Sequence, residues 1–254
     1  MHPILHGSLA VVALTGGLLT GCAPNETADE TADARSTTSS LAGPTRPTTP
    51  PDVAELPAAT IAQRAEAALR GARSLRIHGS GLDGNETIAL DVGVLRTGGA
   101  AGSIALDGVG AKLIAIGKIV YLQPSERMLR DSVPKSEQKA AIEAMRGRWL
   151  KTSVTDPDAA DFVTLTRLAG IADMIFDDVR AGRLSKTGPK VINGVRCIGV
   201  SNRSAVLWVD VRNARPIRLD EKGTGAFNLS QYDAVPPPKA PPSRLVIDVD
   251  KLGS

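Results

Sequence analysis

The chain of 254 residues is poor in aromatic side chains, with three Phe, two Tyr and two Trp. Sites that stack nucleobases or enclose a quaternary ammonium group need several aromatic rings close together, so such sites are not expected. The apolar residues are mostly aliphatic, which suits a wall for alkyl chains. Aliphatic residues fill ordinary cores equally well, so composition alone leaves both interpretations open.

Residues that usually carry catalysis or bind metals are also scarce. Histidine occurs three times, and only His78 would remain after loss of an N-terminal signal. The two cysteines, Cys22 and Cys197, cannot form a disulfide framework, and Cys197 is interpreted as a small buried residue. The chain has no G-x-S-x-G motif, the usual nucleophile elbow. No catalytic residue, metal site or cofactor is therefore predicted, and an enzyme is not expected.

Long apolar runs are absent except for one of about eleven residues, Leu9–Leu19. A membrane-spanning helix needs roughly 20 apolar residues, whereas a secretory signal needs about 7 to 15. The residues Leu19-Thr20-Gly21-Cys22 resemble the bacterial lipobox, which implies cleavage before a lipid-modified cysteine. The sequence thus predicts a signal peptide over residues 1–21, lipidation of Cys22, and a location on the extracytoplasmic face of the cell membrane.

One feature departs from this pattern, because the first six residues contain no Lys or Arg, although export signals usually carry positive charge there. An uncleaved anchor or a buried N-terminal helix therefore stays an alternative.

Residues 22–57 are rich in Thr, Ala, Pro, Asp and Ser and have few large apolar side chains. Such a segment cannot bury enough surface to offset the entropy lost on ordering, so a disordered tether is predicted. It carries more Asp and Glu than Lys and Arg, which leaves the rest of the chain more basic than the total of +3. Attraction to anionic lipid is expected. Nucleic acid is not an expected partner, because basic and aromatic residues do not cluster.

Residues 58–254 are predicted to form one domain that begins with a helix over Thr60–Arg70. Apolar residues then alternate in short segments separated by Gly, for example at Ile88, Leu90, Val92 and Val94, which indicates an antiparallel meander.

The middle of the domain has helical spacing. One helix is predicted over Ser136–Met145, and two short helices over Asp161–Val179 with an interruption at Gly170. Strands resume after Leu184, and Asn193-Gly194 is a strong hairpin signal. This order predicts an α+β fold, with a large antiparallel sheet covered by helices on one face.

Several strand and turn patterns, taken together in this order, resemble the LppX/LprAFG-type lipoprotein family of actinobacteria. Besides the lipobox at Cys22, they are Ala67–Ser74, Leu113–Leu122, Arg148–Lys151, Asn193–Val195, Leu207–Asp210 and Arg215–Leu219. The resemblance covers nearly all of the predicted domain.

The resemblance implies a LolA-like fold, in which a curved, incompletely closed antiparallel β-sheet (a half-barrel) is capped by helices around an apolar cavity. It also implies that the protein binds or carries lipids or lipid-linked molecules for envelope transport. The implied partners are the cell membrane through Cys22, a lipid or lipid-linked ligand, and an envelope transporter or membrane protein.

The family has no single site motif, so the candidate lining comes from the apolar pattern of this chain. It combines inward positions of the meander with the apolar face of the segment from Phe162 to Val179: Leu113, Val120, Phe162, Leu165, Leu168, Ile171 and Ile175. An alternative is a regulatory or structural lipoprotein of the same fold, with a packed interior and a membrane-protein partner. A ligand-sized cavity would favour the first function, and a solid core with an exposed apolar patch the second.

Overall fold

The computed structural model describes residues 52–83, 85–154, 164–180 and 182–249. All of them belong to one compact unit, Thr49–Ser254. The predicted signal peptide 1–21, Cys22 and most of the predicted tether lie outside the described residues.

The ordered chain begins earlier than the sequence predicted. The tether was expected to extend to residue 57, but a 3-10 helix, η1, spans Val53–Glu55. The Val53 side chain is buried, and its backbone N–H donates to the carbonyl oxygen of Val211 at 3.2 Å. Asp52 caps the turn by accepting from the N–H of Ala54 at 3.0 Å. Burial of one valine and these hydrogen bonds order a segment whose composition predicts disorder.

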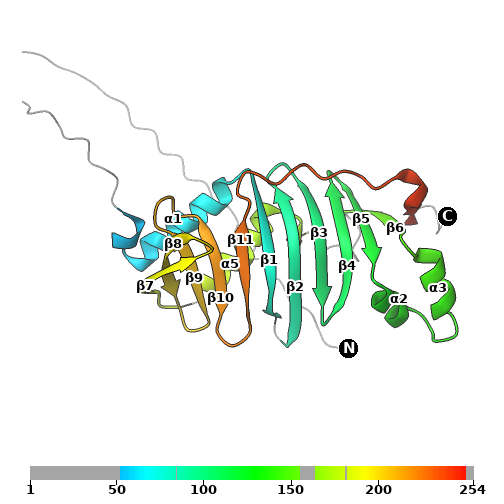
Figure 1. The fold of residues 1–254 in the computed structure, drawn as a ribbon, viewed down its shortest axis with the longest axis horizontal. Coiled ribbons are helices and arrows are strands. Elements are labelled where there is room, and N and C mark those ends of the chain that lie inside the picture. The colour runs from blue at the N-terminus through cyan, green and yellow to red at the C-terminus, as the bar shows by residue number, and fades with distance from the viewer. Residues whose placement is uncertain (1–51, 84, 155–163, 181, 250–254) are drawn as a thin grey trace, which may run out of the picture. The chain divides into compact units, whose positions relative to one another are not determined.

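The described strands form one large sheet that does not close on itself (Figure 1). Its strands are β1 (Ser74–Asp83), β2 (Glu86–Leu95), β3 (Gly99–Leu106), β4 (Val109–Ile116), β5 (Ile119–Pro124), β6 (Trp149–Ser153), β7 (Ser185–Ile192), β8 (Val195–Ser201), β9 (Ala205–Asp210), β10 (Pro216–Glu221), β11 (Gly225–Ser230) and β12 (Val246–Asp248).

Two meanders, β1–β6 and β7–β11, join edge to edge where β1 pairs with β11, in the spatial order β12-β6-β5-β4-β3-β2-β1-β11-β10-β9-β8-β7. All pairings within and between the meanders are antiparallel, whereas β12 lies parallel to β6. The curved, incompletely closed sheet that the family resemblance implies is confirmed, with β12 making it mixed rather than purely antiparallel.

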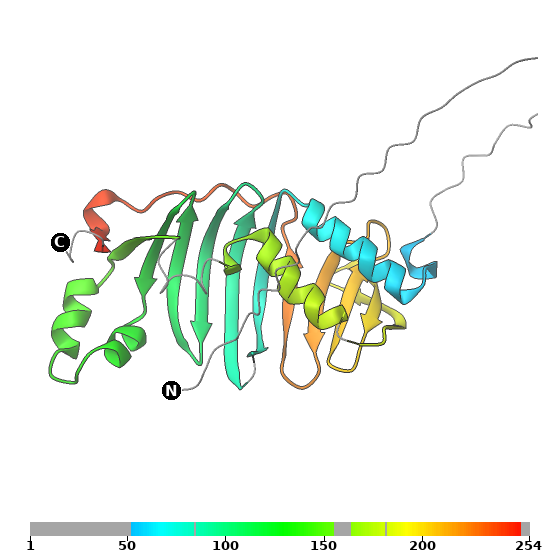
Figure 2. The ribbon, with the colours of Figure 1, turned by 180° about the vertical axis from the view of Figure 1, so that it is seen from behind.

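The helices of the described residues lie in two places (Figures 1 and 2). Helices α1 (Ala58–Gly71) and α5 (Leu168–Arg180) pack together across one face of the sheet, here called the inner face. Helices α2 (Glu126–Ser132) and α3 (Gln138–Met145) lie together near the sheet edge that β12 and β6 form, and α2 contacts β4 and β5. The helices predicted at Thr60–Arg70 and Ser136–Met145 are confirmed within a few residues, whereas α2 was not predicted.

The predicted interruption between two helical segments lies at 166–167, after helical residues 164–165, and not at Gly170, because α5 runs through that glycine. A Cβ atom at position 170 would lie 2.3 Å from the carbonyl oxygen of Thr164, closer than atoms can approach. The glycine therefore allows the preceding turn to pack tightly against the helix. Gly170 is thus needed for the close contact between α5 and the backbone of Thr164. A glycine at a helix end looks the same in the local sequence.

One hydrophobic core joins α1 and α5 to alternate positions of the strands. Ile77, Val92 and Val120 on the sheet are fully buried, as are Ile61 of α1 and Phe176 of α5. Fully burying such a side chain stabilises the fold by about 1.5 to 3 kcal/mol. Because successive strand residues point to opposite faces, the intervening residues lie on the opposite, outer face.

The predicted hairpin is present between β7 and β8. Asn193 and Gly194 both adopt positive φ, 51° and 77°, as a two-residue type I′ turn requires. This turn fixes the register in which Ile192 pairs with Val195.

Candidate functional site

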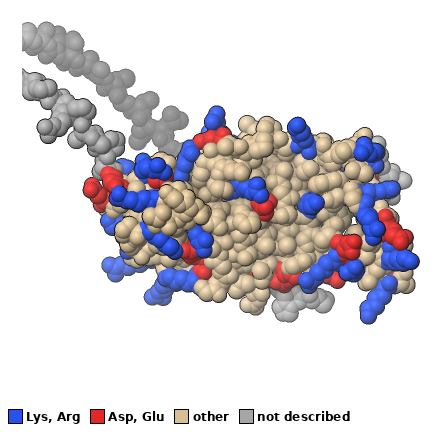
Figure 3. Space-filling model, viewed as in Figure 1, with Lys and Arg blue, Asp and Glu red and all other residues tan. Residues whose placement is uncertain are grey.

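Small side chains occupy the outer face of β3 and a neighbouring position of β4. The outward positions of β3 are Gly99, Ala101, Ser103 and Ala105, and β4 contributes Gly110. Such residues hardly project above the backbone, so they form a low, flat floor. Figure 3 shows the centre of this face largely uncharged, with most charged side chains gathered toward its two ends.

One polar row crosses this floor from strand to strand. His78, Asp91, Ser103, Lys112 and Gln123 are direct cross-strand partners on β1, β2, β3, β4 and β5. Directly opposed residues have Cβ atoms about 4.5 to 5.5 Å apart, so the row is continuous. The antiparallel register therefore assembles polar groups that are spread over 46 positions of the sequence, from residue 78 to residue 123.

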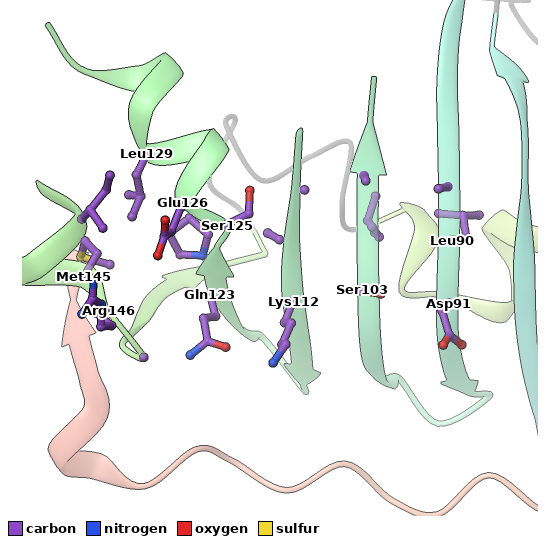
Figure 4. A pocket seen from close by; sticks show the side chains of 18 of the residues that line it. Leu90, Asp91, Ser103, Lys112, Gln123, Ser125, Glu126, Leu129, Met145 and Arg146 are labelled. Atoms are coloured by element: carbon purple, nitrogen blue, oxygen red, sulfur yellow. The ribbon is translucent and has the colours of Figure 1, made fainter. Parts of the chain in front are cut away.

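A hollow of about 700 Å³, here called the outer groove, lies over the floor and is walled by α2 and α3 (Figure 4). Leu129, Ile142 and Met145 supply the apolar part of this wall, and Glu126 and Arg146 the charged part. Figure 4 shows the helix side chains beside Lys112 and Gln123 of the adjacent strands. The hollow is of the size that takes small molecules, about 300 to 1,000 Å³.

The wall is held at the floor by a helix cap. Ser125 ends the extended backbone after β5 and accepts a hydrogen bond from the N–H of Met128 through Oγ at 3.1 Å. Its own N–H donates to the carbonyl oxygen of Gly110 at 2.9 Å. A serine N-cap stabilises a helix start by roughly 1 kcal/mol, and the second bond fixes α2 to β4.

The charges of the outer groove are unevenly paired. Asp91 accepts two hydrogen bonds from Arg76, at 2.8 and 2.7 Å, and Glu126 is paired with Arg130 at 3.2 Å. Within the part of the chain that the structure describes, Lys112 and Arg146 have neither an ion pair nor a side-chain hydrogen bond. The carboxylates are therefore neutralised, and the groove presents two unpaired cations.

The groove continues toward the C-terminal segment 231–245. A second hollow of about 440 Å³ shares Asp91, Ser103 and Lys112 with the first, and is bounded by Val235 and Pro236. The segment packs closely on the floor, since a Cβ atom at Gly93 would lie 2.7 Å from Cγ1 of Val235. Lys112 thus lies where the two hollows meet.

The lining residues predicted from the sequence lie on the inner face. Leu113, Val120, Leu168, Ile171 and Ile175 are buried in the core, and Leu165 is partly buried against it. Phe162 lies outside the described residues. The six described residues therefore gather in one cluster, and none of them lines the outer groove.

The outer groove was missed because its floor consists of Ala, Gly and Ser. Apolar periodicity marks large side chains and is silent about a surface made of small ones. The available signal was the repeated small residue at every second position of the Gly-rich strands, such as Gly99, Ala101, Ser103 and Ala105.

Comparisons with known proteins give matches at the level of structure. No family model and no curated protein sequence matches the chain. The crystal structure of LprF from Mycobacterium bovis matches with a TM-score of 0.48 and 15% identity, covering 72% of this chain and 96% of that one. The Mycobacterium tuberculosis lipoprotein LppX matches with a TM-score of 0.41 and 15% identity, covering 70% and 96%. The chain is thus similar in structure to lipoproteins of the LppX and LprF type, at low sequence identity.

A further match is the MucA/MucB complex of Pseudomonas aeruginosa, with a TM-score of 0.32 and 14% identity, covering 74% of this chain and 59% of that one. Among the described residues of the present protein, no helix has the length and apolar character needed to cross a membrane.

Proposed function

We propose that the protein is a membrane-anchored lipoprotein that binds an anionic lipid or lipid-linked molecule and carries it in the cell envelope. Its alkyl part would lie on the small-residue floor of the outer groove, and its acidic group would contact Lys112 and Arg146. The observation that carries the proposal is the pair of cations, unpaired among the described residues, at a mostly apolar hollow of about 700 Å³.

The chemistry of the groove suits an amphiphile. Each CH₂ group removed from water contributes about 0.8 kcal/mol, and a flat floor of Ala, Gly and Ser accepts an extended chain without a specific shape. An acidic headgroup near Lys112 and Arg146 would pair charges that the described residues leave unpaired. No reacting group is required, so the proposed role is binding and not catalysis.

The proposed anchor brings the groove to its ligand. A diacylglycerol on Cys22 would hold the chain at the membrane. The acidic, Pro-rich tether would let the domain stand off the surface. The protein would then exchange lipid between the membrane and an acceptor in the envelope, such as a transporter.

The inner-face residues predicted from the sequence remain a second proposed lining. Leu113, Val120, Phe162, Leu165, Leu168, Ile171 and Ile175 would receive acyl chains if α5 acted as a lid. This proposal differs from the outer groove in the face of the sheet that the ligand occupies, so substitutions can separate the two.

The test fills the floor with a large side chain. Ser103 is exposed on the floor of the groove, and Ser80 is exposed on the same face of β1 outside it. Binding of a fluorescent fatty acid to Ser103→Trp should be at least tenfold weaker than to the unsubstituted protein, whereas Ser80→Trp should bind normally. Lys112→Gln should also weaken binding, with Lys118→Gln in the neighbouring turn as its control.

Native mass spectrometry of the protein from an actinobacterial host should show a bound lipid. Protein that is always empty and takes up no fluorescent lipid would contradict the proposed function. Normal binding to Ser103→Trp, together with weaker binding to an inner-face variant such as Leu113→Ala, would place the ligand on the inner face instead.

The alternative of a regulatory or structural lipoprotein is favoured by one observation. Large apolar side chains are exposed at the strand ends, with Leu82, Leu106, Ile116 and Ile119 between 36% and 42% exposed. A photo-crosslinking residue at Ile116 should yield one discrete membrane-protein adduct in cells if this function is correct. A lipid-filled groove without such an adduct would exclude it.

A further inference from the structure

A separate hollow of about 480 Å³, here called the arginine pocket, lies at one end of the strands. Four segments far apart in the sequence contribute to it: the end of α1, the turn from β2 to β3, the turn from β4 to β5, and the start of α5. Arg70, Arg96 and Arg167 line the pocket, and no Asp or Glu is among its described lining residues. We propose that this pocket binds a phosphate group, either free or as part of a lipid headgroup.

Arg96 is held in place by the end of α1. Its Nε donates to the carbonyl oxygen of Ala72 at 2.9 Å, and its Nη2 to that of Arg70 at 3.1 Å and also to that of Gly71. These are the last carbonyls of the helix, which need partners and favour a cation. Nη1 of Arg96 makes no hydrogen bond within the described part of the chain. The guanidinium is therefore positioned while part of its donor capacity stays available.

Arg70 of α1 is also fixed by hydrogen bonds, in this case to two carboxylates. Its Nε donates to Glu66 at 3.0 Å and its Nη2 to Asp173 at 2.6 Å, and Nη1 has no partner among the described residues. Glu66 is committed to this network, since a hydrogen bond from Arg180 and a further one from Arg70 hold its pKa below the usual range. These two acids compensate the charge of Arg70, so the uncompensated positive charge of the pocket comes from Arg96 and Arg167.

Arg167 supplies the least compensated charge. The residue lies just before α5 and is exposed, and its side chain has no ion pair or hydrogen bond in the described ranges. The two turns that face it contain Gly98 and Gly117, and the positions where their Cβ atoms would lie are open. The three guanidinium groups can therefore be reached by a ligand from solvent.

Three arginines with free donors favour an oxyanion with several acceptor oxygens. The planar guanidinium fork matches the oxygen spacing of phosphate, and such charge-assisted hydrogen bonds are about twice as strong as neutral ones. The Thr97 residue at the same turn adds a hydroxyl to the lining. The volume of about 480 Å³ leaves room for an organic group attached to the phosphate, as in a phosphate ester.

The arginine pocket shares no lining residue with the outer groove. It therefore adds a site to the proposed function and does not depend on it. A failure of lipid uptake in the groove would leave phosphate binding here intact.

The test compares two arginine substitutions in the full chain carrying Cys22→Ser, which removes the expected lipid anchor. Arg167→Gln removes an unpaired guanidinium from the pocket. Arg64→Gln removes an exposed guanidinium from α1 that does not line the pocket and has no partner among the described residues. Both variants lose the same charge and should keep the far-ultraviolet circular dichroism of the unsubstituted protein.

Calorimetric titration with inorganic phosphate should show at least tenfold weaker binding to Arg167→Gln and unchanged binding to Arg64→Gln. A parallel flotation assay compares vesicles of phosphatidylglycerol with vesicles of phosphatidylcholine. If Arg167→Gln, but not Arg64→Gln, loses binding to phosphatidylglycerol vesicles, the phosphate belongs to a lipid headgroup. If Arg167→Gln loses binding of inorganic phosphate but binds the vesicles normally, the ligand is a free phosphate. Equal losses in both variants, or no binding of either probe, would overturn the proposal.

Discussion

Arg76 and Asp91 lie on the neighbouring strands β1 and β2 and meet through two hydrogen bonds, Nε to Oδ1 at 2.8 Å and Nη2 to Oδ2 at 2.7 Å. They are diagonal neighbours, because the direct partner of Asp91 is His78. This fork neutralises a carboxylate that lines the outer groove, and so determines that the unpaired charge of the groove is positive.

Arg76→Gln should therefore weaken binding of an anionic amphiphile several-fold, although Arg76 does not line the larger hollow. The released carboxylate of Asp91 would repel the headgroup near Lys112. Stability should change by about 1 kcal/mol or less, because ion pairs that solvent still reaches, such as this half-buried one, contribute little. Fluorescent-lipid titration and urea unfolding measure the two effects, with Arg64→Gln as the charge-matched control. Unchanged affinity would show that Asp91 does not act on the ligand.

Tyr232 anchors the start of the C-terminal segment. Its hydroxyl donates to the carbonyl oxygen of Pro216 at 2.6 Å, and the guanidinium of Arg215 lies 4.9 Å from its ring centre. Tyr232→Phe should cost about 1 to 3 kcal/mol of unfolding free energy, because the carbonyl loses its donor. Tyr121→Phe, whose hydroxyl makes no hydrogen bond among the described residues, should change urea unfolding little. Equal effects of both variants would exclude the anchoring role.

Cys197 should be unreactive in the folded protein. Burial raises the pKa of its thiol to about 11, so the reactive thiolate is nearly absent at pH 8. In the Cys22→Ser chain, a thiol reagent should label no cysteine in buffer and one in urea. Rapid labelling of the native protein would contradict this assignment.

The same shift predicts a pH dependence of stability. The unfolded thiol titrates near pH 8.5, below the folded value, so the unfolded chain loses its proton first. The contribution of Cys197 to stability is therefore fully present below about pH 8.5 and is lost as the pH rises through about 11. Urea unfolding of the native chain and of Cys197→Ala should differ less at pH 10.5 than at pH 8. A difference that grows with pH would have the wrong sign.

Leu113 tests the role of the inner face. It is 1% exposed in the main core, so Leu113→Ala should cost about 2 to 5 kcal/mol. Ile114→Ala on the half-buried outer side of the same strand should cost clearly less. Recovery of most of the lost stability on adding a fatty acid would support the proposed inner lining. An equal cost at both positions would contradict the assignment of faces.

The sequence predicted the elements whose large apolar residues recur with a clear period. Leu90, Val92 and Val94 alternate along β2, and each is buried on the inner face. The α2 helix was missed because its seven residues are mostly charged, and it is determined by the Ser125 cap and its contact with β4. Short polar helices of this kind have no apolar period to detect.

Two further features depend on long-range pairing and could not be predicted. The strand β12 pairs with β6 across nearly one hundred residues, Val246 opposite Trp149, and three residues give no local signal for a parallel partner. The polar row through Asp91, Ser103 and Lys112 depends on the register of several hairpins at once. A shift of one residue in the pairing register of a strand moves each of its side chains to the opposite face of the sheet. A surface site of small residues is therefore determined only by the assembled sheet.

The C-terminal segment leaves β11 in the middle of the sheet and ends at the far edge, beside β6 (Figure 1). On the way Val235 packs over Gly93 and Pro238 over Gly99. The segment crosses the curved first meander and is fixed at both ends. If the meander flattened, the segment would have to extend or to leave Gly93 and Gly99. The curvature of the strands and the width of the floor are therefore coupled.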